Sequence, residues 1–470
     1  ANLNPLLEGY KEAAMLNPIY DPLYVIDVNE TRYYLADSYE VSEDGMQITV
    51  KLKEGLKWHD GEAITADDMI FTMDVCSDTN NGAGGTNIVI LNDQPVKYEK
   101  VDDLTVKVTL PMASASYADL LGGLTLIPEH VFEGNPSVVS AGEANMKGIG
   151  SGPYKVTEFK QDEYLLLEKY EDYYMGAPSI DKVTFRIISD LSAQEVALMN
   201  GEVNFMELAN APAVAKYEAD PNFTVVKYPE GRVNYLAVNK FCETVQDPKV
   251  VEAVFAALNR DEIIAGAYGD GMAESANSIF SNVNTFYDPS VEGYTQDVEK
   301  AKQLVKETGL DSKTLTLYFN SERVYMKESA QIIQQQLKNV GINLEVIPLE
   351  SAGFFEKVFG TDGDYEFYLN GYGAVGDPDQ VVAGMYDGTW GVNLAVSDEV
   401  SQLWKDARTV YTPEERAAIY KQIQIQTRDE LTCYPIAYPN YVFVTTSNIK
   451  GADTIKRTPV FEDYTKLTME

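Results

Sequence analysis

The chain has 470 residues, 45% of them hydrophobic, which is enough for two or three globular domains. Its 73 acidic and 37 basic residues give a formal charge of −36, which argues against nucleic acid as a partner because phosphate binding needs clustered Lys and Arg. No run of residues approaches the ~18 apolar side chains that a bilayer-spanning helix needs.

The first half of the sequence has the pattern of hairpins and short helices. Apolar and polar residues alternate over Ile48–Lys53 and Leu104–Leu110, which predicts half-buried strands. Capping boxes at Thr65–Asp68 and Ser192–Glu195 predict the starts of two helices. The glycine-rich segment Gly148–Tyr154 lacks the spacing of a nucleotide-binding loop and leads into a strand, so we interpret it as a tight turn.

The pattern changes at the middle of the chain. Val233–Asn239 is short, β-branched and aromatic, and predicts a strand. The next segment, Asp247–Leu258, predicts a helix with Asp247 as the N-cap and Pro248 in its first turn. Hairpins precede this point and alternating strands and helices follow it, so we interpret the strand as a crossing between two lobes.

The second half alternates strands with helices. Leu315–Phe319, a helix ending at Gly341 and Ile342–Ile347 predict a β-α-β unit with a parallel strand pair. Further on we expect a helix over Phe354–Phe359, a strand over Tyr365–Leu369, a helix from the capping box Thr412–Glu415 to about Glu430, and a returning strand over Leu431–Thr446.

Several motifs occur in the order of a known family. The most specific one runs from Ser42–Gly45 through Leu52–Gly61 to Ile64–Asp68. The other motifs are Asn4–Leu7, Ile19–Leu23, Gly150–Tyr154, Leu198–Glu202, Asn259–Ile264 and Gly376–Asp379. Over nearly its whole length the chain therefore resembles the extracytoplasmic solute-binding proteins of ABC importers, family 5, which carry peptides, nickel chelates and some oligosaccharides.

The resemblance implies an α/β, periplasmic-binding-protein-like fold of two lobes, with a β-rich subdomain inserted in the first lobe and two crossing strands as a hinge near Val233 and Tyr434. The implied boundaries are 1–26, 151–233 and 437–470 for the first lobe, 27–150 for the inserted subdomain and 234–436 for the second lobe. The ligand is expected between the lobes, where it favours a closed form that the membrane permease recognises.

Part of the expected ligand site follows a strand of the second lobe. Gly371, Tyr372 and Gly373 lie in a segment that, in peptide-binding relatives, pairs with the ligand main chain. Those relatives place an aspartate for the peptide amino terminus where this chain has Ala374, so we expect Asp377 or Asp379 to substitute. The alternative is that both aspartates belong to a helix cap or turn.

Further ligand residues follow from the same resemblance. Trp390 and Asn393, in the segment Gly388–Asn393, match a loop that walls the pocket in relatives, and an aromatic residue between two glycines is poorly placed for a core. Tyr438 lies on the returning strand, where it contacts a ligand or packs at the hinge. Arg323 follows a strand end near which dipeptide binders carry a carboxylate-pairing arginine, although a solvent-exposed side chain fits the sequence equally well.

Other function classes fit the sequence less well. His59 and His130 are the two histidines of the chain, and no nucleophile elbow or zinc-protease motif accompanies them, so we expect neither an enzyme nor a bound metal or cofactor. A nickel-chelate carrier, a sugar binder and a ligand-presenting sensor stay open. We expect a monomer outside the cytoplasm, as a cell-surface lipoprotein or in the periplasm, with a short peptide and an ABC permease as partners.

The sequence also bears on the redox state and on processing. Cys76, Cys242 and Cys433 have no metal-ligand spacing and allow one disulfide at most; Cys242 and Cys433 are candidate neighbours, and we expect free buried thiols. The chain begins at Ala1 without an initiator Met or a signal segment, which we interpret as a trimmed sequence.

Overall fold

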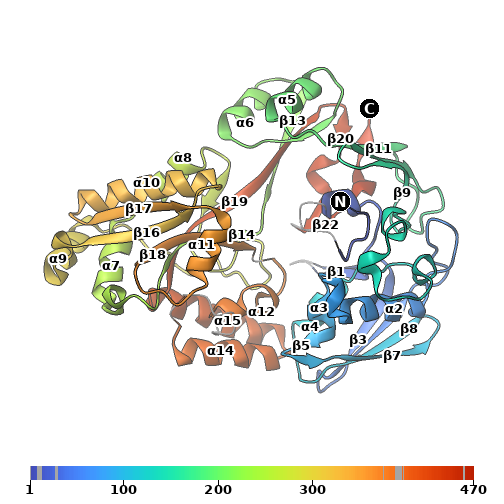
Figure 1. The fold of residues 1–470 in the computed structure, drawn as a ribbon, viewed down its shortest axis with the longest axis horizontal. Coiled ribbons are helices and arrows are strands. Elements are labelled where there is room, and N and C mark those ends of the chain that lie inside the picture. The colour runs from blue at the N-terminus through green and yellow to red at the C-terminus, as the bar shows by residue number, and fades with distance from the viewer. Residues whose placement is uncertain are drawn as a thin grey trace. The chain divides into compact units, whose positions relative to one another are not determined.

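The computed structural model describes residues 2–7, 13–26, 30–373, 375–386, 394, 396–458 and 461–470. The chain divides into two compact units, each assembled from separate segments: unit 1 is Ala1–Glu207, Tyr217–Val226 and Phe443–Glu470, and unit 2 is Leu208–Lys216 and Lys227–Val442. Strands β13 (Phe223–Pro229) and β19 (Cys433–Thr446) each contain a boundary between these units (Figure 1). The lobe boundaries implied by the resemblance stay a prediction.

Unit 1 contains an antiparallel sheet in the order β3-β4-β8-β7, formed by Ala36–Val41, Gln47–Leu52, Thr105–Thr109 and Lys97–Asp102. Alternate residues of β4 are buried, as the sequence pattern predicts for a half-buried strand. Helix α2 (Ala66–Ser77) packs on β7 and β8, and its capping box forms as predicted: Thr65 Oγ1 accepts from the Asp67 amide, and Asp68 accepts from the Thr65 amide. A core that includes the fully buried Trp58 joins this sheet to α2.

A second core of unit 1 lies around an antiparallel sheet in the order β11-β10-β9, which is Lys182–Arg186, Tyr164–Lys169 and Tyr154–Lys160. The tight turn predicted over Gly148–Tyr154 is instead a bend whose amides at Gly152 and Tyr154 donate to the Ile19 and Pro18 carbonyl oxygens. The amide of Gly150 donates to His59 Nδ1 (3.1 Å), so His59 carries its proton on Nε2, 2.9 Å from the Gly152 carbonyl oxygen. Burial lowers the pKa of His59 to about 4, and the ring therefore stays neutral near pH 7.

The other elements of unit 1 are short. One predicted helix start is wrong: α5 is capped by Asp190, whose side chain accepts from the Ala193 amide, and not by Ser192. The elements are α1 (Ala13–Leu16), β1 (Tyr24–Ile26), β2 (Thr31–Tyr33), α3 (Thr86–Val89), β5 (Ile90–Leu91), β6 (Gln94–Pro95), α4 (Tyr117–Gly122), α5 (Leu191–Met199), β12 (Phe205–Glu207), β20 (Ile449–Lys450), β21 (Lys456–Thr458), β22 (Phe461–Glu462) and β23 (Thr468–Met469).

Unit 2 is built around a mixed sheet whose strands follow the order β19-β14-β18-β16-β17. Strand β14 (Arg232–Val238) runs antiparallel to β19 and to β18 (Phe367–Gly373), whereas β16 (Thr314–Asn320) runs parallel to β18 and to β17 (Asn343–Leu349). The predicted β-α-β unit with its parallel pair is therefore confirmed. The strand predicted at the middle of the chain is β14, and it is buried along almost its whole length.

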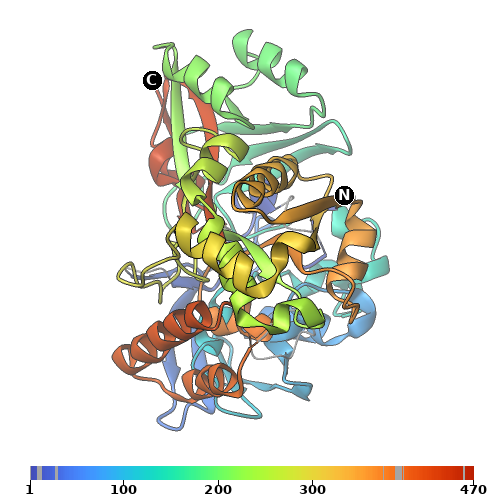
Figure 2. The ribbon, with the colours of Figure 1, turned by 90° about the vertical axis from the view of Figure 1, so that its left-hand side faces the viewer.

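Both faces of this sheet are covered. Alternate residues of β14 enter two different cores, with Leu236 and Val238 on one face and Tyr235 and Ala237 on the other. Helices α7 (Pro248–Ala257), α9 (Val298–Thr308) and α10 (Val324–Asn339) contribute to the first core, together with Ile263 of α8 (Arg260–Ala267). Helices α11 (Ser351–Val358), α13 (Ala383–Tyr386), α14 (Asp398–Thr409) and α15 (Pro413–Asp429) contribute to the second, and α14 and α15 lie side by side (Figures 1 and 2).

Helix α7 begins as predicted, with Asp247 as the N-cap and Pro248 in the first turn. Helix α15 begins after Thr412, but the Thr412 side chain makes no capping hydrogen bond. The remaining elements of unit 2 are α6 (Ala211–Glu218), which continues across a unit boundary, β15 (Ala273–Ser275) and α12 (Pro378–Val381). Cys76, Cys242 and Cys433 are buried free thiols, as expected.

A buried carboxyl group in unit 1 gives a prediction on pH dependence. Asp21 is 1% exposed, and its Oδ2 accepts from the hydroxyls of Tyr173 (2.8 Å) and Tyr174 (2.7 Å). Burial raises the pKa of Asp21 to about 7, although these hydrogen bonds and the charge of Lys53 act in the opposite direction. The Asp463 carboxylate also raises this pKa.

We therefore expect Asp21→Asn to change how stability depends on pH. Between the unfolded pKa of about 3.9 and the folded pKa of about 7, the folded protein holds a proton that the unfolded chain releases. The stabilising effect is complete below the lower value and is lost as the pH rises through the upper one. As the pH rises through this range, the free energy of unfolding of the unmodified protein should fall relative to that of Asp21→Asn by up to about 1.4 kcal/mol per pH unit. Urea unfolding of both proteins across this range measures the difference, and parallel profiles would contradict the prediction.

Candidate ligand-binding site

The candidate site begins with the two edges of β18. Along one edge, β18 pairs with β14 over its full length, from Val238↔Phe367 to Arg232↔Gly373. Along the other edge its pairing with β16 comprises Leu317↔Phe367 and Tyr318↔Tyr368. Among the described residues, the segment from Leu369 to Gly373 is therefore paired with β14 and not with β16. Such a strand edge can accept main-chain hydrogen bonds from another extended segment.

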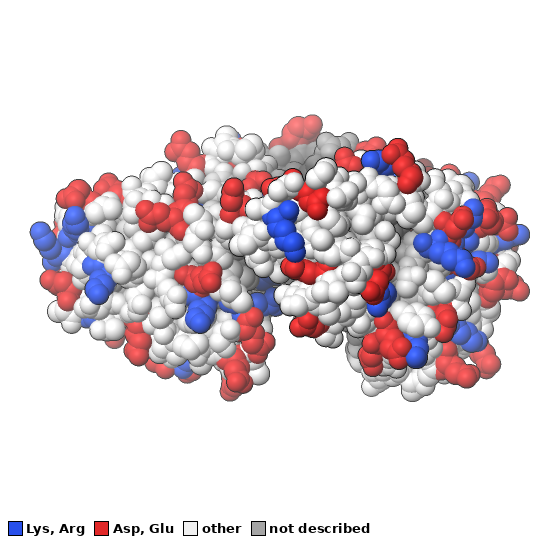
Figure 3. Space-filling view, turned by 90° about the horizontal axis from the view of Figure 1, so that it is seen from above, with Lys and Arg blue, Asp and Glu red and all other residues white. Residues whose placement is uncertain are grey.

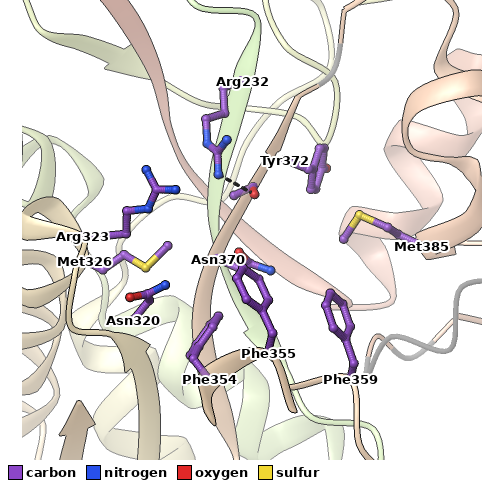
Figure 4. Close-up of a pocket in the computed structure, with 11 residues that line it drawn as sticks. Arg232, Asn320, Arg323, Met326, Phe354, Phe355, Phe359, Asn370, Tyr372 and Met385 are labelled. Carbon is purple, nitrogen blue, oxygen red and sulfur yellow. Dashed lines mark hydrogen bonds between the residues drawn. The ribbon is translucent and has the colours of Figure 1, made fainter. Parts of the chain in front are cut away.

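A pocket of about 200 Å³ lies beside this segment, wholly within unit 2. Its walls come from the end of β16, the start of α10, the middle and end of α11, the start of β14, β18 and α13. The lining residues are Arg232, Asn320, Arg323, Met326, Phe354, Phe355, Phe359, Asn370, Gly371, Tyr372 and Met385. In Figure 4 the arginine side chains lie at one end of the pocket and the phenylalanine rings at the other.

Arg232 and Arg323, here called the arginine pair, form the basic end of the pocket. Arg232 donates from Nε to Asn234 Oδ1 (3.1 Å) and from an Nη to the Gly371 carbonyl oxygen (2.7 Å), which ties β14 to β18 (Figure 4). Arg323 is the exposed residue that precedes α10. The carboxylate of its chain neighbour Glu322 accepts hydrogen bonds from the amide and hydroxyl of Ser351. These hydrogen bonds lower the pKa of Glu322, and the positive charge of Arg323 lowers it further.

The arginine pair is unusual for such an acidic protein. Asp and Glu outnumber Lys and Arg by 73 to 37, and acidic side chains are spread over the surface drawn in Figure 3. Nevertheless, within the described part of the chain neither Arg232 nor Arg323 lies within ion-pair distance of a carboxylate. The guanidinium groups at this pocket can therefore bind an anion without first breaking an internal ion pair.

Phe354, Phe355 and Phe359, here called the phenylalanine cluster, form the apolar end. Phe354 is fully buried, whereas Phe355 and Phe359 are 41% and 50% exposed. The rings of Phe355 and Phe359 stack with centroids 5.7 Å apart, and Phe354 meets Phe355 edge-on at 5.4 Å. The buried Met326 and Met385 add polarizable apolar surface.

Three of the residues expected to bind ligand, Gly371, Tyr372 and Arg323, are brought together at this pocket. Gly373 follows at the exposed end of β18. The Tyr372 hydroxyl donates to the Ile279 carbonyl oxygen (2.7 Å) and lies 3.0 Å from the Tyr386 hydroxyl. Burial raises the pKa of Tyr372 well above its ordinary value, so this hydroxyl stays protonated. Contact of these residues with a ligand stays a prediction.

Asp377 and Asp379 lie in the helix cap that was the alternative to ligand binding. Asp377 is the N-cap of α12 and accepts from the Asp379 amide. Its two carboxylate oxygens accept from the Arg416 guanidinium at 2.6 and 3.0 Å, and all of these groups are buried. Asp379 accepts from Arg408 Nε at 2.6 Å. A peptide ammonium group at either aspartate would have to compete with an arginine for the carboxylate. These ion pairs do not favour the predicted binding of a peptide amino terminus by Asp377 or Asp379, which stays a prediction.

Tyr438 packs in the core of unit 2, with 2% of its surface exposed. Its hydroxyl accepts from the Ser278 amide (3.0 Å) and lies 3.0 Å from Asn277 Oδ1. The ring thus packs in this core, and its packing at a hinge or its contact with a ligand stays a prediction. Trp390 and Asn393 lie outside the described residues, as does Ala374.

Sequence reasoning missed most of the pocket. Arg232 lies one residue before the predicted strand and was not singled out, although a basic residue at a strand end in an acidic chain is a detectable signal. The pair Phe354-Phe355 was assigned to a helix, but the sequence does not show that one ring is buried and the other exposed. Asn320, Met326 and Met385 carry no local signal that separates pocket lining from ordinary packing.

The described residues contain no group of three or more His, Cys, Asp or Glu side chains placed to hold a metal ion. No helix in this part of the chain is both long enough and apolar enough to cross a bilayer.

An α/β unit with a pocket beside the end of a sheet strand, basic at one end and aromatic at the other, has the architecture of a small-molecule binding protein. The chain belongs to the bacterial extracellular solute-binding proteins, family 5, whose family model matches residues 30–393. It is 26% identical over 469 residues to the dipeptide-binding protein of Escherichia coli strain K12, with 92% of this chain and 86% of that protein covered.

Solved structures show the same fold. The ABC transporter substrate-binding protein CtaP of Listeria monocytogenes has a TM-score of 0.91 and 34% identity, covering 100% of this chain and 98% of that one. The oligopeptide-binding protein AppA of Bacillus subtilis, solved with a nonapeptide, has a TM-score of 0.77 and 26% identity, covering 100% and 97% of the two chains. The expected α/β, periplasmic-binding-protein-like fold is therefore confirmed.

Proposed function

We propose that the protein binds a short peptide along Leu369–Gly373 of β18 and delivers it to the membrane permease of an ABC importer. The observation that carries this proposal is the edge of β18 that is not paired with β16, beside a pocket with basic and apolar ends. A peptide added to such an edge is held by main-chain hydrogen bonds, which do not depend on its sequence, while pockets give preference for particular side chains.

The named relatives support a peptide as the ligand. The Escherichia coli relative is a dipeptide-binding protein, and the Bacillus subtilis structure holds a nonapeptide. In this role the protein is a monomer outside the cytoplasm, lipid-anchored or periplasmic, and it releases the peptide chemically unchanged. Peptide binding favours a closed form through contacts made only in that form, and the permease recognises this form.

The test is calorimetric titration with a peptide pool of mixed lengths, followed by mass spectrometry of the recovered peptides, which should be intact. Gly371→Ala should weaken binding by about 10- to 100-fold, because it moves the Arg232 guanidinium that lines the pocket and so removes a charge-assisted hydrogen bond to the ligand. A methyl group at Gly371 would come within 2.1 Å of Asn234 Oδ1 and 2.9 Å of Arg232 Nε, and would displace the arginine from the Gly371 carbonyl.

Gly84→Ala is the control, because Gly84 lies outside β18 and the pocket and its methyl group would make an ordinary contact at 3.9 Å with the Leu6 carbonyl oxygen, so binding should stay near that of the unmodified protein. If no peptide in the pool binds, the proposed function is wrong. If peptides bind equally well to the unmodified protein and to Gly371→Ala, the protein is a peptide carrier but β18 is not its main-chain site.

A further inference from the structure

The pocket of unit 2 combines a basic surface at one end with an aromatic surface at the other. One end holds the arginine pair, without a carboxylate partner among the described residues. The other end holds the phenylalanine cluster, of which Phe355 and Phe359 remain 41% and 50% exposed. When a ligand covers exposed aromatic rings at the rim of a pocket, it removes their apolar surface from water, and this favours binding.

The pocket is large enough to hold one aromatic side chain. The whole pocket has a volume of about 200 Å³, whereas a dry apolar cavity of about 150 Å³ holds a benzene molecule. The phenylalanine cluster offers both stacked and edge-on faces to an incoming ring. A methyl side chain would leave most of this surface in contact with water.

The basic end requires an anion with planar acceptors. Guanidinium groups bind carboxylates through paired N–H donors, and neither arginine of the pair has to leave an internal carboxylate to do so. Arg232 is already oriented by Asn234 and by the Gly371 carbonyl oxygen, whereas Arg323 has an exposed side chain that can adjust. Gly371 and Tyr372 of β18 also line the pocket.

We propose that this pocket selects peptides in which an aromatic side chain lies next to a carboxylate, with the ring on the phenylalanine cluster and the carboxylate at the arginine pair. The inference rests on the proposed function, because it names the class of peptide for the same site. The carboxylate comes from the peptide's C-terminus or from an adjacent acidic side chain. Both sources present the same group to the arginines.

Titration calorimetry with defined peptides separates these sources. Ala-Ala-Phe should bind about 10- to 100-fold more tightly than Ala-Ala-Ala, the difference expected for burial of one aromatic side chain. If the C-terminus supplies the carboxylate, Ala-Ala-Phe-amide binds weakly and Ala-Phe-Glu-amide does not recover the affinity. If a side chain supplies it, Ala-Phe-Glu-amide binds at least as tightly as Ala-Ala-Phe. Either result supports the proposal.

Variants assign the two ends of the pocket. Arg323→Gln should weaken binding of the carboxylate-bearing peptide by about 10- to 100-fold and leave binding of its C-terminal amide nearly unchanged. Lys338→Gln removes the same charge from an exposed position at the far end of α10 and should have little effect. Phe355→Ala should reduce the preference for Phe over Ala in the peptide. Phe241→Ala, which truncates a ring with a similar exposure of 40%, should not.

The outcomes distinguish this inference from the proposed function. If Ala-Ala-Phe, its amide and Ala-Ala-Ala bind with equal affinity, and Arg323→Gln and Phe355→Ala have no effect, the selectivity is wrong while peptide binding stands. If peptides with a small or basic residue in place of Phe bind more tightly, the proposed selectivity for an aromatic side chain is equally wrong. If none of these peptides nor any member of the mixed pool binds, the proposed function itself fails.

Discussion

Asp377→Asn is expected to lower the free energy of unfolding by about 3–5 kcal/mol, because it leaves the Arg416 guanidinium buried without its counter-charge. The Asp377 and Arg416 side chains are each 7% exposed. Arg416 is also enclosed by Phe286 and Tyr420, with its guanidinium carbon 4.9 and 5.2 Å from the ring centroids. Water therefore cannot replace the lost carboxylate without disturbing this packing.

Urea unfolding measures the loss, and Glu307→Gln is the control. It breaks the exposed pair Lys249–Glu307, whose side chains are 56% and 38% exposed, and should cost less than about 1 kcal/mol. A loss of similar size in both variants would contradict the buried pair as the cause.

The same variant tests whether Asp377 holds a peptide amino terminus. In that case Asp377→Asn weakens binding of a free peptide far more than binding of its N-acetylated form. If Asp377 acts as the helix cap and ion-pair partner that the structure shows, the two peptides are affected equally. Binding is compared at a temperature at which the variant is folded.

Gly150→Ala is expected to destabilise unit 1 by several kcal/mol. A methyl group at Gly150 would lie 1.9 Å from the Ile19 carbonyl oxygen, so the backbone itself would have to move. Overpacking of this kind costs about 1–3 kcal/mol. The movement would also break the hydrogen bonds between Gly150 and His59, and each buried polar group left unpaired costs about 1–3 kcal/mol.

Thermal unfolding monitored by circular dichroism measures this effect. Gly123→Ala is the control in the same unit, because its methyl group would make an ordinary contact at 3.6 Å with the Leu120 carbonyl oxygen. A transition temperature for Gly150→Ala close to that of the control would show that the bend tolerates a side chain.

Local sequence patterns predicted those strands and helices whose buried positions or caps are set by residues close together in the chain. Strand β4 (Gln47–Leu52) lies within one residue of the predicted Ile48–Lys53, and α7 begins at the predicted cap, because alternation and capping are encoded within a few residues. The second capping box failed at Ser192 because Asp190, two residues earlier, offers a competing carboxylate. Sequence pattern alone does not decide between adjacent candidate caps.

The site was harder to predict because its members come from distant segments. Resemblance led to Gly371, Tyr372 and Arg323, which line one pocket. The same reasoning selected Asp377, but its partner Arg416 lies in α15, and no local signal connects them. Likewise, Phe355 is exposed and Phe354 is buried although they are neighbours on one helix, since the difference depends on how α11 packs in unit 2.

The path of β19 has a consequence for the order in which the protein can fold during synthesis. Phe443–Thr445 at the end of β19 pair with β12, which is made much earlier. Ribosomes add about 5–20 residues per second. Strand β12 therefore has no strand to pair with at the end of β19 until all of Lys227–Val442 has been translated. Every segment of unit 2 has by then been made, whereas unit 1 still lacks its whole last segment, Phe443–Glu470. A nascent chain halted at Val442 would thus carry a complete unit 2 and an exposed β12 edge, which is the species a chaperone would meet.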